Sequence, residues 1–296
     1  MKTVKNFLPS VLAAVLLTML GAGSAQAEDS GGYGNSGYSD FNNNCGGSSY
    51  FGSSLQVIGL TSDQRLICFN EFNPGEAKTI DTVTGFSGDT KLVGIDFRVQ
   101  DKSLYGVGDK GGVYKISTND AFAQKVSQLT VPLNGAFFGV DFNPAADRLR
   151  VISNTGQNLR HNVNAGGTTI VDGTLSYTAP ATTTALGVTG SAYTNNDLDL
   201  NTATTLYALD STLDQVAIQS PANNGTLQAT GKLTVNTTPS VGFDIYSTIR
   251  NGTTVNIEGF TSLTSSDDRV VRFYSVRLFS GKATSRGSFS SQDEVG

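Results

Sequence analysis

A segment of about fifty residues recurs along the chain, and this repeat constrains the fold more than any other feature. Its clearest copies begin with glycine, an apolar residue, aspartate and another apolar residue, at 94–97, 139–142 and 242–245. A degenerate copy at 190–193 keeps the glycine and the aromatic residue, and we expect a further copy at 47–50. Each copy is therefore expected to form the same small structural unit, stacked against its neighbours.

Each copy continues with apolar segments in a fixed register. A second segment starts about ten residues after the opening glycine, at 57–60, 104–107, 149–152, 206–209 and 255–257. A third follows at 66–69, 113–116, 159–163, 216–218 and 270–273, and a weaker fourth closes most copies, as at 125–129. Four short strands per repeat of this length are typical of β-propeller blades. The sequence therefore predicts an all-β protein, a β-propeller of about five four-stranded blades, with six blades or a two-sheet β-sandwich as alternatives.

The composition agrees with this architecture and excludes several others. The chain has 34 glycines among 296 residues, and only 15% of its residues are charged. Gly, Asn, Asp and Thr favour turns and strands, so coiled coils and helical bundles are excluded. The formal net charge is −5 and no basic segment occurs, which argues against nucleic acid as a partner.

The first 27 residues have the features of a secretory signal peptide. Lys2 and Lys5 precede an apolar segment at 11–17, and small residues follow up to a cleavage signal that ends at Ala27. The apolar segment is too short for a membrane span. We therefore expect residues 1–27 to be removed on export. The remaining protein is expected to have no membrane span and to lie in the periplasm, outside the cell or on the cell surface.

The rest of the chain is expected to form one domain. Residues 28–46 are rich in Gly, Ser and Asn, which predicts a flexible tail because such a segment buries little apolar surface. The repeats assign residues 47–290 to a single propeller, and residues 291–296 remain as a C-terminal tail.

Long motifs in the third and fourth copies are distinctive. They read FGVDFNPAADRLRVISNTGQNLR at 138–160, AYTN at 192–195, TLYALD at 205–210 and QSPANNGTL at 219–227. Together they resemble an exported bacterial family catalogued as domain of unknown function 4394, over roughly residues 55–245. The resemblance implies an exported, propeller-like fold and supplies no activity, because no chemistry is established for that family.

The aspartates of the repeat, Asp96, Asp141 and Asp244, are the first candidate site. Each alternates with apolar residues, so it shares a face of its strand with the glycine. On innermost strands these side chains would lie near the ring axis or at blade interfaces. There they would hold Ca²⁺, which prefers six to eight oxygen ligands. Alternatively, each accepts hydrogen bonds from the next blade, since buried charges have to be paired, and the repetition favours this structural interpretation.

A second candidate metal site is the segment that contains Asp197, Asp199 and Asn201, which begins like a calcium-binding loop. The pattern then fails, because Thr202 stands where the loop needs glycine and Ala208 where it needs glutamate. A polar turn is therefore the alternative interpretation, and it is the one that the pattern favours.

The third copy carries an unusual concentration of polar side chains, namely Arg150, Asn154, Gln157, Asn158 and Arg160. The two arginines fall on adjacent predicted strands that flank a turn. Guanidinium and amide groups suit a carboxylate, phosphate or sugar ligand. The alternative is that they pair with the repeat aspartates of neighbouring blades.

The two cysteines and the single histidine complete the set of reactive side chains. Export permits a disulfide between Cys45 and Cys68. If a strand separates the two, however, they lie about 10 Å apart, beyond bonding range, so both states stay open. One His and two Cys cannot build a zinc site in each repeat, and nothing places a nucleophile near His161, so no catalytic residue is predicted.

These observations favour an exported, non-enzymatic propeller that binds a small molecule, a saccharide or a surface protein. A Ca²⁺-dependent propeller hydrolase or lyase is the first alternative. A structural component of the cell surface or extracellular matrix is the second.

Overall fold

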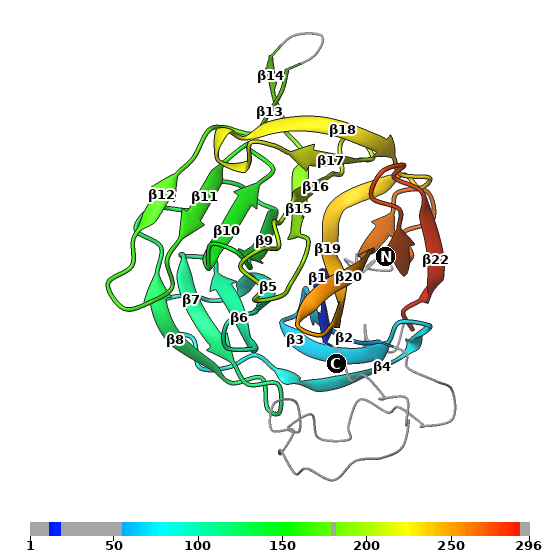
Figure 1. The fold of residues 1–296 in the computed structure, drawn as a ribbon. Helices are drawn as coiled ribbons and strands as arrows, with labels where there is room; N and C mark the ends of the chain where they lie inside the picture. Colours follow the sequence, from blue (N-terminus) through cyan, green and yellow to red (C-terminus); the bar gives the residue numbers. More distant parts are fainter. Residues whose placement is uncertain (1–11, 19–54, 179–181, 291–296) are drawn as a thin grey trace, which may run out of the picture.

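The protein is a β-propeller of five sheets arranged around a central axis (Figure 1). The computed structural model describes residues 12–18, 55–178 and 182–290. The four main strands of each sheet follow one another in chain order from the axis outwards, and sequential strands pair antiparallel.

Each sheet forms one blade. Blade 1 consists of β1 (Leu12–Thr18), β2 (Gln56–Thr61), β3 (Arg65–Asn70) and β4 (Asn73–Thr82). Blade 2 consists of β5 (Leu92–Arg98), β6 (Ser103–Gly108), β7 (Gly112–Ile116) and β8 (Ala123–Gln128). Blade 3 consists of β9 (Phe138–Asn143), β10 (Arg148–Ser153), β11 (Asn158–His161) and β12 (Thr169–Val171).

The last two blades are larger. Blade 4 consists of β15 (Val188–Tyr193), β16 (Leu206–Asp210), β17 (Gln215–Gln219) and β18 (Thr226–Lys232), extended by a small hairpin of β13 (Ser176–Tyr177) and β14 (Thr183–Thr184). A short 3₁₀ turn, η2 (Ala222–Asn224), joins β17 to β18. Blade 5 consists of β19 (Thr237–Arg250), β20 (Thr253–Ser265), β21 (Val271–Val276) and β22 (Ala283–Ser288).

The glycine of the repeat is explained by the close approach of neighbouring inner strands. A Cβ atom on Gly94 would lie 2.5 Å from Val140 Cγ2 in the next blade, and one on Gly190 would lie 2.8 Å from Phe243 Cβ. Real Cβ contacts are essentially never this short, so a side chain here would push the inner strands apart. The repeated glycine therefore sets how tightly the five sheets pack around the axis.

The hydrophobic core is divided into five clusters, one between each pair of neighbouring blades. Between blades 5 and 1, the cluster is mainly aromatic. The ring of Phe69 meets those of Phe273 and Phe289 edge to face at 5.1 and 5.0 Å, and Phe260 stacks on Phe273 at 5.4 Å. Since no strand is shared between the first and the last sheet, this aromatic packing joins the two ends of the ring.

The predicted architecture is confirmed: the described residues form five blades of four strands in the predicted register, rather than six blades or a two-sheet sandwich. The innermost strand of blade 1 differs from expectation. It is β1, which pairs with β2 and lies inside the segment predicted to be a signal peptide. The copy expected at 47–50 lies outside the described residues, as do the tails predicted at 28–46 and 291–296. Within the described chain, no helix is long and apolar enough to cross a membrane.

Candidate functional site

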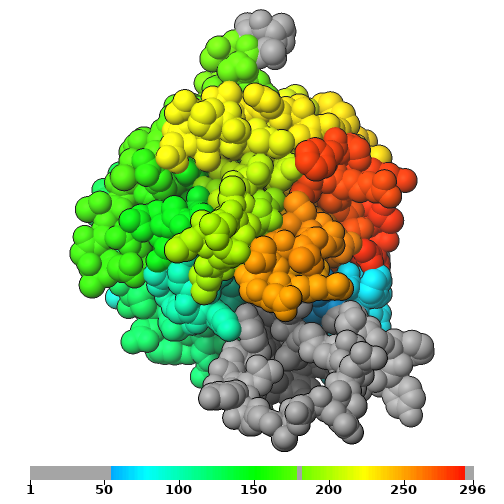
Figure 2. Space-filling model, in the orientation of Figure 1, coloured from blue at the N-terminus to red at the C-terminus, as the bar shows by residue number. Residues whose placement is uncertain are grey.

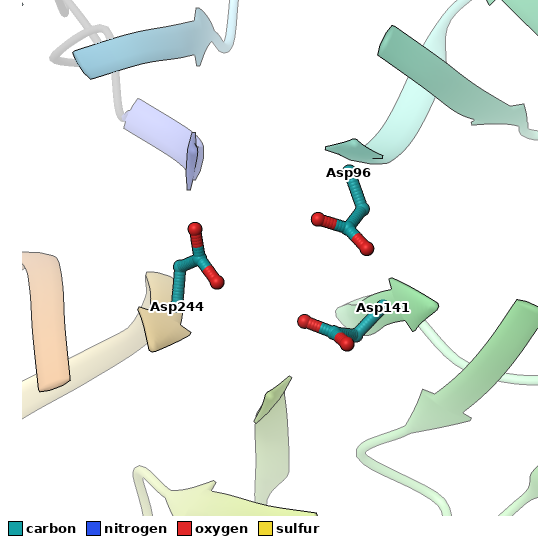
Figure 3. Close-up of side chains that lie close together, drawn as sticks. All are labelled: Asp96, Asp141 and Asp244. Carbon is teal, nitrogen blue, oxygen red and sulfur yellow. The ribbon is translucent and has the colours of Figure 1, made fainter. Parts of the chain in front are cut away.

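The three repeat aspartates meet at the ring axis. Asp96 on β5, Asp141 on β9 and Asp244 on β19 each offer a carboxylate oxygen, and these atoms lie within 4.8 Å of one another. Figure 3 shows the three carboxylates converging from separate inner strands. All three residues are buried, with exposed fractions of 6% or less. These side chains thus lie near the axis on innermost strands, and metal binding by them stays a prediction.

Backbone groups of the adjoining blade reach two of these carboxylates. The N–H of Phe142 in blade 3 donates to Asp96 Oδ2 at 2.6 Å, and the N–H of Tyr193 in blade 4 donates to Asp141 Oδ1 at 3.2 Å. In the third, Asp244 Oδ1 accepts the N–H of its own neighbour Ile245 at 2.6 Å. Asp96 and Asp141 thus tie one inner strand to the next, in the way that the structural interpretation describes.

The electrostatics of the cluster are unfavourable to three negative charges. Burial raises the pKa of Asp96 and Asp141 well above the ordinary value of 3.8, and the neighbouring carboxylates raise both pKa values further. Backbone hydrogen bonds oppose the shift only in part. A proton or a hard cation among the oxygens would relieve this repulsion, and carboxylates are ligands that Ca²⁺ accepts. In blade 4 the corresponding position is Ala192, so the carboxylates do not complete a ring.

A small pocket opens at the end of the axis where the inner strands begin. It has a volume of about 160 Å³ and takes lining residues from all five blades, among them Gln64, Lys91, Phe137, Thr189 and Ser240. Thr189 is 1% exposed, and within the described residues its Oγ1 has no hydrogen-bond partner. A buried hydroxyl without a partner is costly, but this atom is closed off from the pocket and does not mark a ligand contact.

The predicted calcium-binding loop is engaged with blade 5. Asp197 Oδ2 accepts hydrogen bonds from the N–H and the hydroxyl of Thr254 at 2.8 and 2.6 Å, and Asp199 Oδ2 accepts the hydroxyl of Thr253 at 2.8 Å. The N–H of Asn201 donates to Asp199 Oδ1 at 2.9 Å, and these bonds hold the pKa of Asp199 below its usual range. Figure 2 shows the loop lying against the β19–β20 hairpin. Its carboxylates thus serve the polar turn, and calcium binding here stays a prediction.

The polar cluster of blade 3 is centred on Arg150, which is 2% exposed. Its guanidinium donates to Asp172 Oδ2 at 2.6 Å, to Asn158 Oδ1 at 2.7 Å, to Asn223 Oδ1 at 2.8 Å and to the Tyr193 hydroxyl at 3.2 Å. The carboxylate partner is Asp172, between β12 and β13, rather than a repeat aspartate. Four internal acceptors therefore engage all three nitrogens of this guanidinium.

The other predicted ligand-binding residues are also bonded internally. Arg160 Nε donates to both oxygens of Asp172 at 2.9 and 3.0 Å. Asn154 and Gln157 hold the loop at 132–137, where they accept backbone N–H groups at 2.9 to 3.1 Å. These contacts tie blade 3 to its neighbours, and ligand binding by this set stays a prediction.

His161 and Cys68 occupy structural positions. His161 is buried on β11, where its Nε2 lies 2.8 Å from Ser127 Oγ of blade 2 and its Nδ1 lies 3.0 Å from Thr169 Oγ1. Burial lowers the pKa of His161, which favours the neutral form of the ring. The described contacts give it no carboxylate partner, which a serine triad would require. Cys68 is buried and disulfide-bonded, whereas Cys45 lies outside the described residues.

One family model matches most of the chain, over residues 65–296, and it is described as a domain of unknown function (DUF4394). The chain belongs to this family. The resemblance carried by the motifs is thereby confirmed, and the match extends beyond the residues that the motifs covered. No curated protein matches the chain.

Several solved structures are similar to this DUF4394 protein at low identity. An auxiliary nutrient binding protein from Bacteroides thetaiotaomicron is 11% identical with a TM-score of 0.40, over 74% of this chain and 53% of that one. A protein of unknown function from the same organism is 12% identical with a TM-score of 0.41, over 78% and 54%. YCF48 bound to D1 peptide is 10% identical with a TM-score of 0.34, over 78% and 63%. The chain thus spans about half to two thirds of the length of these proteins.

The axial pocket is the part of the DUF4394 domain that sequence reasoning missed. Its residues include Lys91, Phe137, Thr189 and Ser240, which stand one to three positions before the repeat glycines. They differ in type from copy to copy, so the repeat itself does not single them out. Their position in the repeat could have identified them, because the residues just before each glycine surround the same end of the axis.

Proposed function

We propose that this DUF4394 protein is an exported, non-enzymatic binding module whose ligand enters the axial pocket. The observation that supports this most is the pocket at the end of the axis, which is lined by residues of all five blades. Side chains from five separate sheets meet only at the axis, so a ligand there contacts every repeat at once.

The size and lining of the pocket suggest what it takes. Its volume of about 160 Å³ is well below the roughly 300–1,000 Å³ of sites for drug-sized molecules. It is therefore suited to one amino-acid side chain or one sugar ring. Phe137 offers an apolar surface, Ser240 offers a hydroxyl, and Lys91 is an exposed cation at the rim.

Ligand-observed NMR tests this proposal with two defined sets of probes, monosaccharides and N-acetyl amino-acid amides. We expect members of one set to bind the protein. This binding should be lost in Ser240→Trp, because the added ring fills the pocket. Lys78→Trp adds the same ring on the outer strand β4 and serves as the matched control. Absence of binding from both sets, or binding that survives the filled pocket, contradicts the proposal.

Export is a separate part of the proposal, supported by the charged, apolar and small-residue segments of 1–27. N-terminal sequencing of the protein recovered outside the inner membrane should begin at Glu28. Recovery of the chain with residues 12–18 intact contradicts removal of the leader and assigns β1 permanently to blade 1.

A second candidate function is cation binding at the axis, favoured by the convergence of Asp96, Asp141 and Asp244. The carboxylate oxygens fit a hard divalent cation such as Ca²⁺, which would neutralise a cluster whose pKa values are raised. In this role the ion links the inner strands of three blades. Its binding is measured by the change in stability with and without Ca²⁺.

A further inference from the structure

A second, larger groove lies where blade 5 meets blade 1, away from the axial pocket. It has a volume of about 870 Å³ and is walled by β20, β21, β22 and the β21–β22 turn, with Phe72 of blade 1 on the opposite side. Strands β22 and β4 lie side by side at this junction (Figure 1). The groove therefore belongs to the meeting of the two ends of the ring.

Two aromatic side chains present exposed faces to the groove. Phe72 is 59% exposed and Phe279 is 74% exposed, although large apolar side chains are usually buried. Each is held by a neighbour: the Arg286 guanidinium lies 4.5 Å from the centroid of Phe72, and Tyr207 meets Phe279 edge to face at 6.2 Å. Anchored rings with open faces form a ready stacking surface for a ligand.

The groove also carries cations that are free to bind an anion. Arg286 is paired with Glu258 at 3.0 Å and with Glu71 at 3.6 Å. By contrast, Arg277 and Lys282 are exposed, and within the described residues their side chains form no ion pair. Two unpaired cations side by side on one turn are notable in a chain with a net charge of −5.

The turn that bears these cations is held firmly in place. The N–H of Arg277 donates to the carbonyl of Lys282 at 3.0 Å, and the hydroxyl of Thr230 in blade 4 donates to the carbonyl of Leu278 at 2.5 Å. Gly281 has a φ of +69°, and a Cβ atom on it would lie 2.5 Å from backbone atoms of blade 4. The cations and Phe279 are therefore pre-positioned rather than carried on a loose loop.

We propose that this groove binds an acidic polysaccharide, such as a chain of uronic acid units. The aromatic faces of Phe72 and Phe279 would stack on the apolar faces of sugar rings. Arg277 and Lys282 would bind the carboxylates by charge-assisted hydrogen bonds. Hydroxyl side chains line the wall between them and match the hydroxyls of a sugar; they belong to Ser275, Ser280, Thr284 and Ser285.

Titration calorimetry with a galacturonic acid trimer tests this proposal on the intact protein. We expect binding to weaken by about tenfold or more in Phe279→Ala and in Arg277→Gln/Lys282→Gln. Raising the salt concentration should weaken binding of the trimer to the unchanged protein. It should have little effect on the residual binding of the trimer to the double variant. Phe122→Ala and Lys110→Gln change an exposed ring and an exposed cation on blade 2, and both should bind as the unchanged protein does.

Two further probes separate the polysaccharide from other occupants. A neutral maltotriose that binds equally well would overturn the role of the cations, and a triglutamate peptide that binds equally well would overturn the role of the sugar ring. Binding that is the same in all groove variants also overturns the proposal. Unchanged melting temperatures show that the exposed substitutions leave the fold intact. Ser240→Trp fills the axial pocket without touching this groove, so the two proposals fail separately.

Discussion

Buried carboxylates occur in two regions of this ring, and the two regions differ in how their charge is balanced. On the outer side of blade 3, Asp172 is 4% exposed and faces two guanidinium groups, those of Arg150 and Arg160. At the axis, Asp96 and Asp141 face each other and Asp244, and within the described residues they have backbone N–H groups but no cationic side chain as partners. In the first arrangement the negative charge is balanced by guanidinium groups, whereas the partners described for Asp96 and Asp141 carry no full positive charge.

This difference separates a structural cluster from a candidate site. A buried charge that is paired and hydrogen-bonded has no need of a ligand, while carboxylates that raise one another's pKa do. In the sequence, both clusters consist of charged residues on or beside predicted strands, and the spacing does not show which of them are paired. Only the partners distinguish them.

The largest effect is expected from breaking the paired region. Arg150→Met removes the inner cation, so Asp172 keeps only Arg160 of its two guanidinium partners and three further acceptors lose a donor. This should cost about 3 kcal/mol of the free energy of unfolding. Arg160→Met is the matched control, because its side chain is 32% exposed and should cost about 1 kcal/mol or less. Urea unfolding measures both, and equal losses would contradict the central role of Arg150.

The opposite sign is expected at the axis. Asp141→Asn keeps the shape and an oxygen for the Tyr193 N–H but removes one charge, so it should stabilise the protein at pH 7 by more than about 1 kcal/mol. Asp172→Asn is the matched change in the paired region and should destabilise it. The comparison fails if both substitutions shift the free energy of unfolding in the same direction.

The pH dependence sharpens the same contrast. The folded-state pKa values of Asp96 and Asp141 lie above the ordinary value of 3.8, so their contribution to stability is full below about that pH and is lost as the pH rises through the raised pKa values. The advantage of Asp96→Asn/Asp141→Asn over the unchanged protein should therefore grow from pH 4 to pH 7.

His161 acts with the opposite sign in this experiment. Its pKa is lowered by burial, so its contribution is lost as the pH falls below the ordinary value of 6.5. Because it is present in both proteins, it cancels in the difference between their unfolding curves. A difference that stays constant with pH would show that the axial carboxylates do not titrate in this range.

The smallest effect is expected from calcium. If the axial cluster binds Ca²⁺ weakly, millimolar calcium should stabilise the unchanged protein by about 1 kcal/mol or less, and Asp141→Asn should abolish this gain. Asp199→Asn tests the other predicted site, and it should leave the gain in place. Differential scanning calorimetry with and without a chelator measures the effect, and a gain that depends on Asp199 alone would move the site to the loop.

The fold was predictable because a sequence pattern of about fifty residues recurs along the chain and each copy forms one blade. Gly94, Gly139 and Gly242 mark inner strands in equivalent positions, and the alternation after each of them fixes which residues share a face. The convergence of the three aspartates at the axis follows from the same equivalence. Residues at equivalent positions of the repeat therefore occupy equivalent positions around the axis.

The remaining features depend on contacts that the repeat does not encode. Asp172 lies outside the motif, so the partner of Arg150 could not be chosen from spacing. The groove combines Phe72 with the turn at 277–282, which meet only because the two ends of the ring adjoin. Likewise, β1 pairs with β2 across a long intervening segment, where the motif predicted a strand at 47–50.

No described strand of blade 1 belongs to the sheet of blade 5, and this has a consequence for where the chain can begin and end. Each described blade is built from consecutive strands, and aromatic packing around Phe69 and Phe273 holds the last blade to the first. Joining the two ends and reopening the chain in the linker at 83–91 would leave every sheet whole. The fold is thus suited to circular permutation, with its termini free to lie between any two blades.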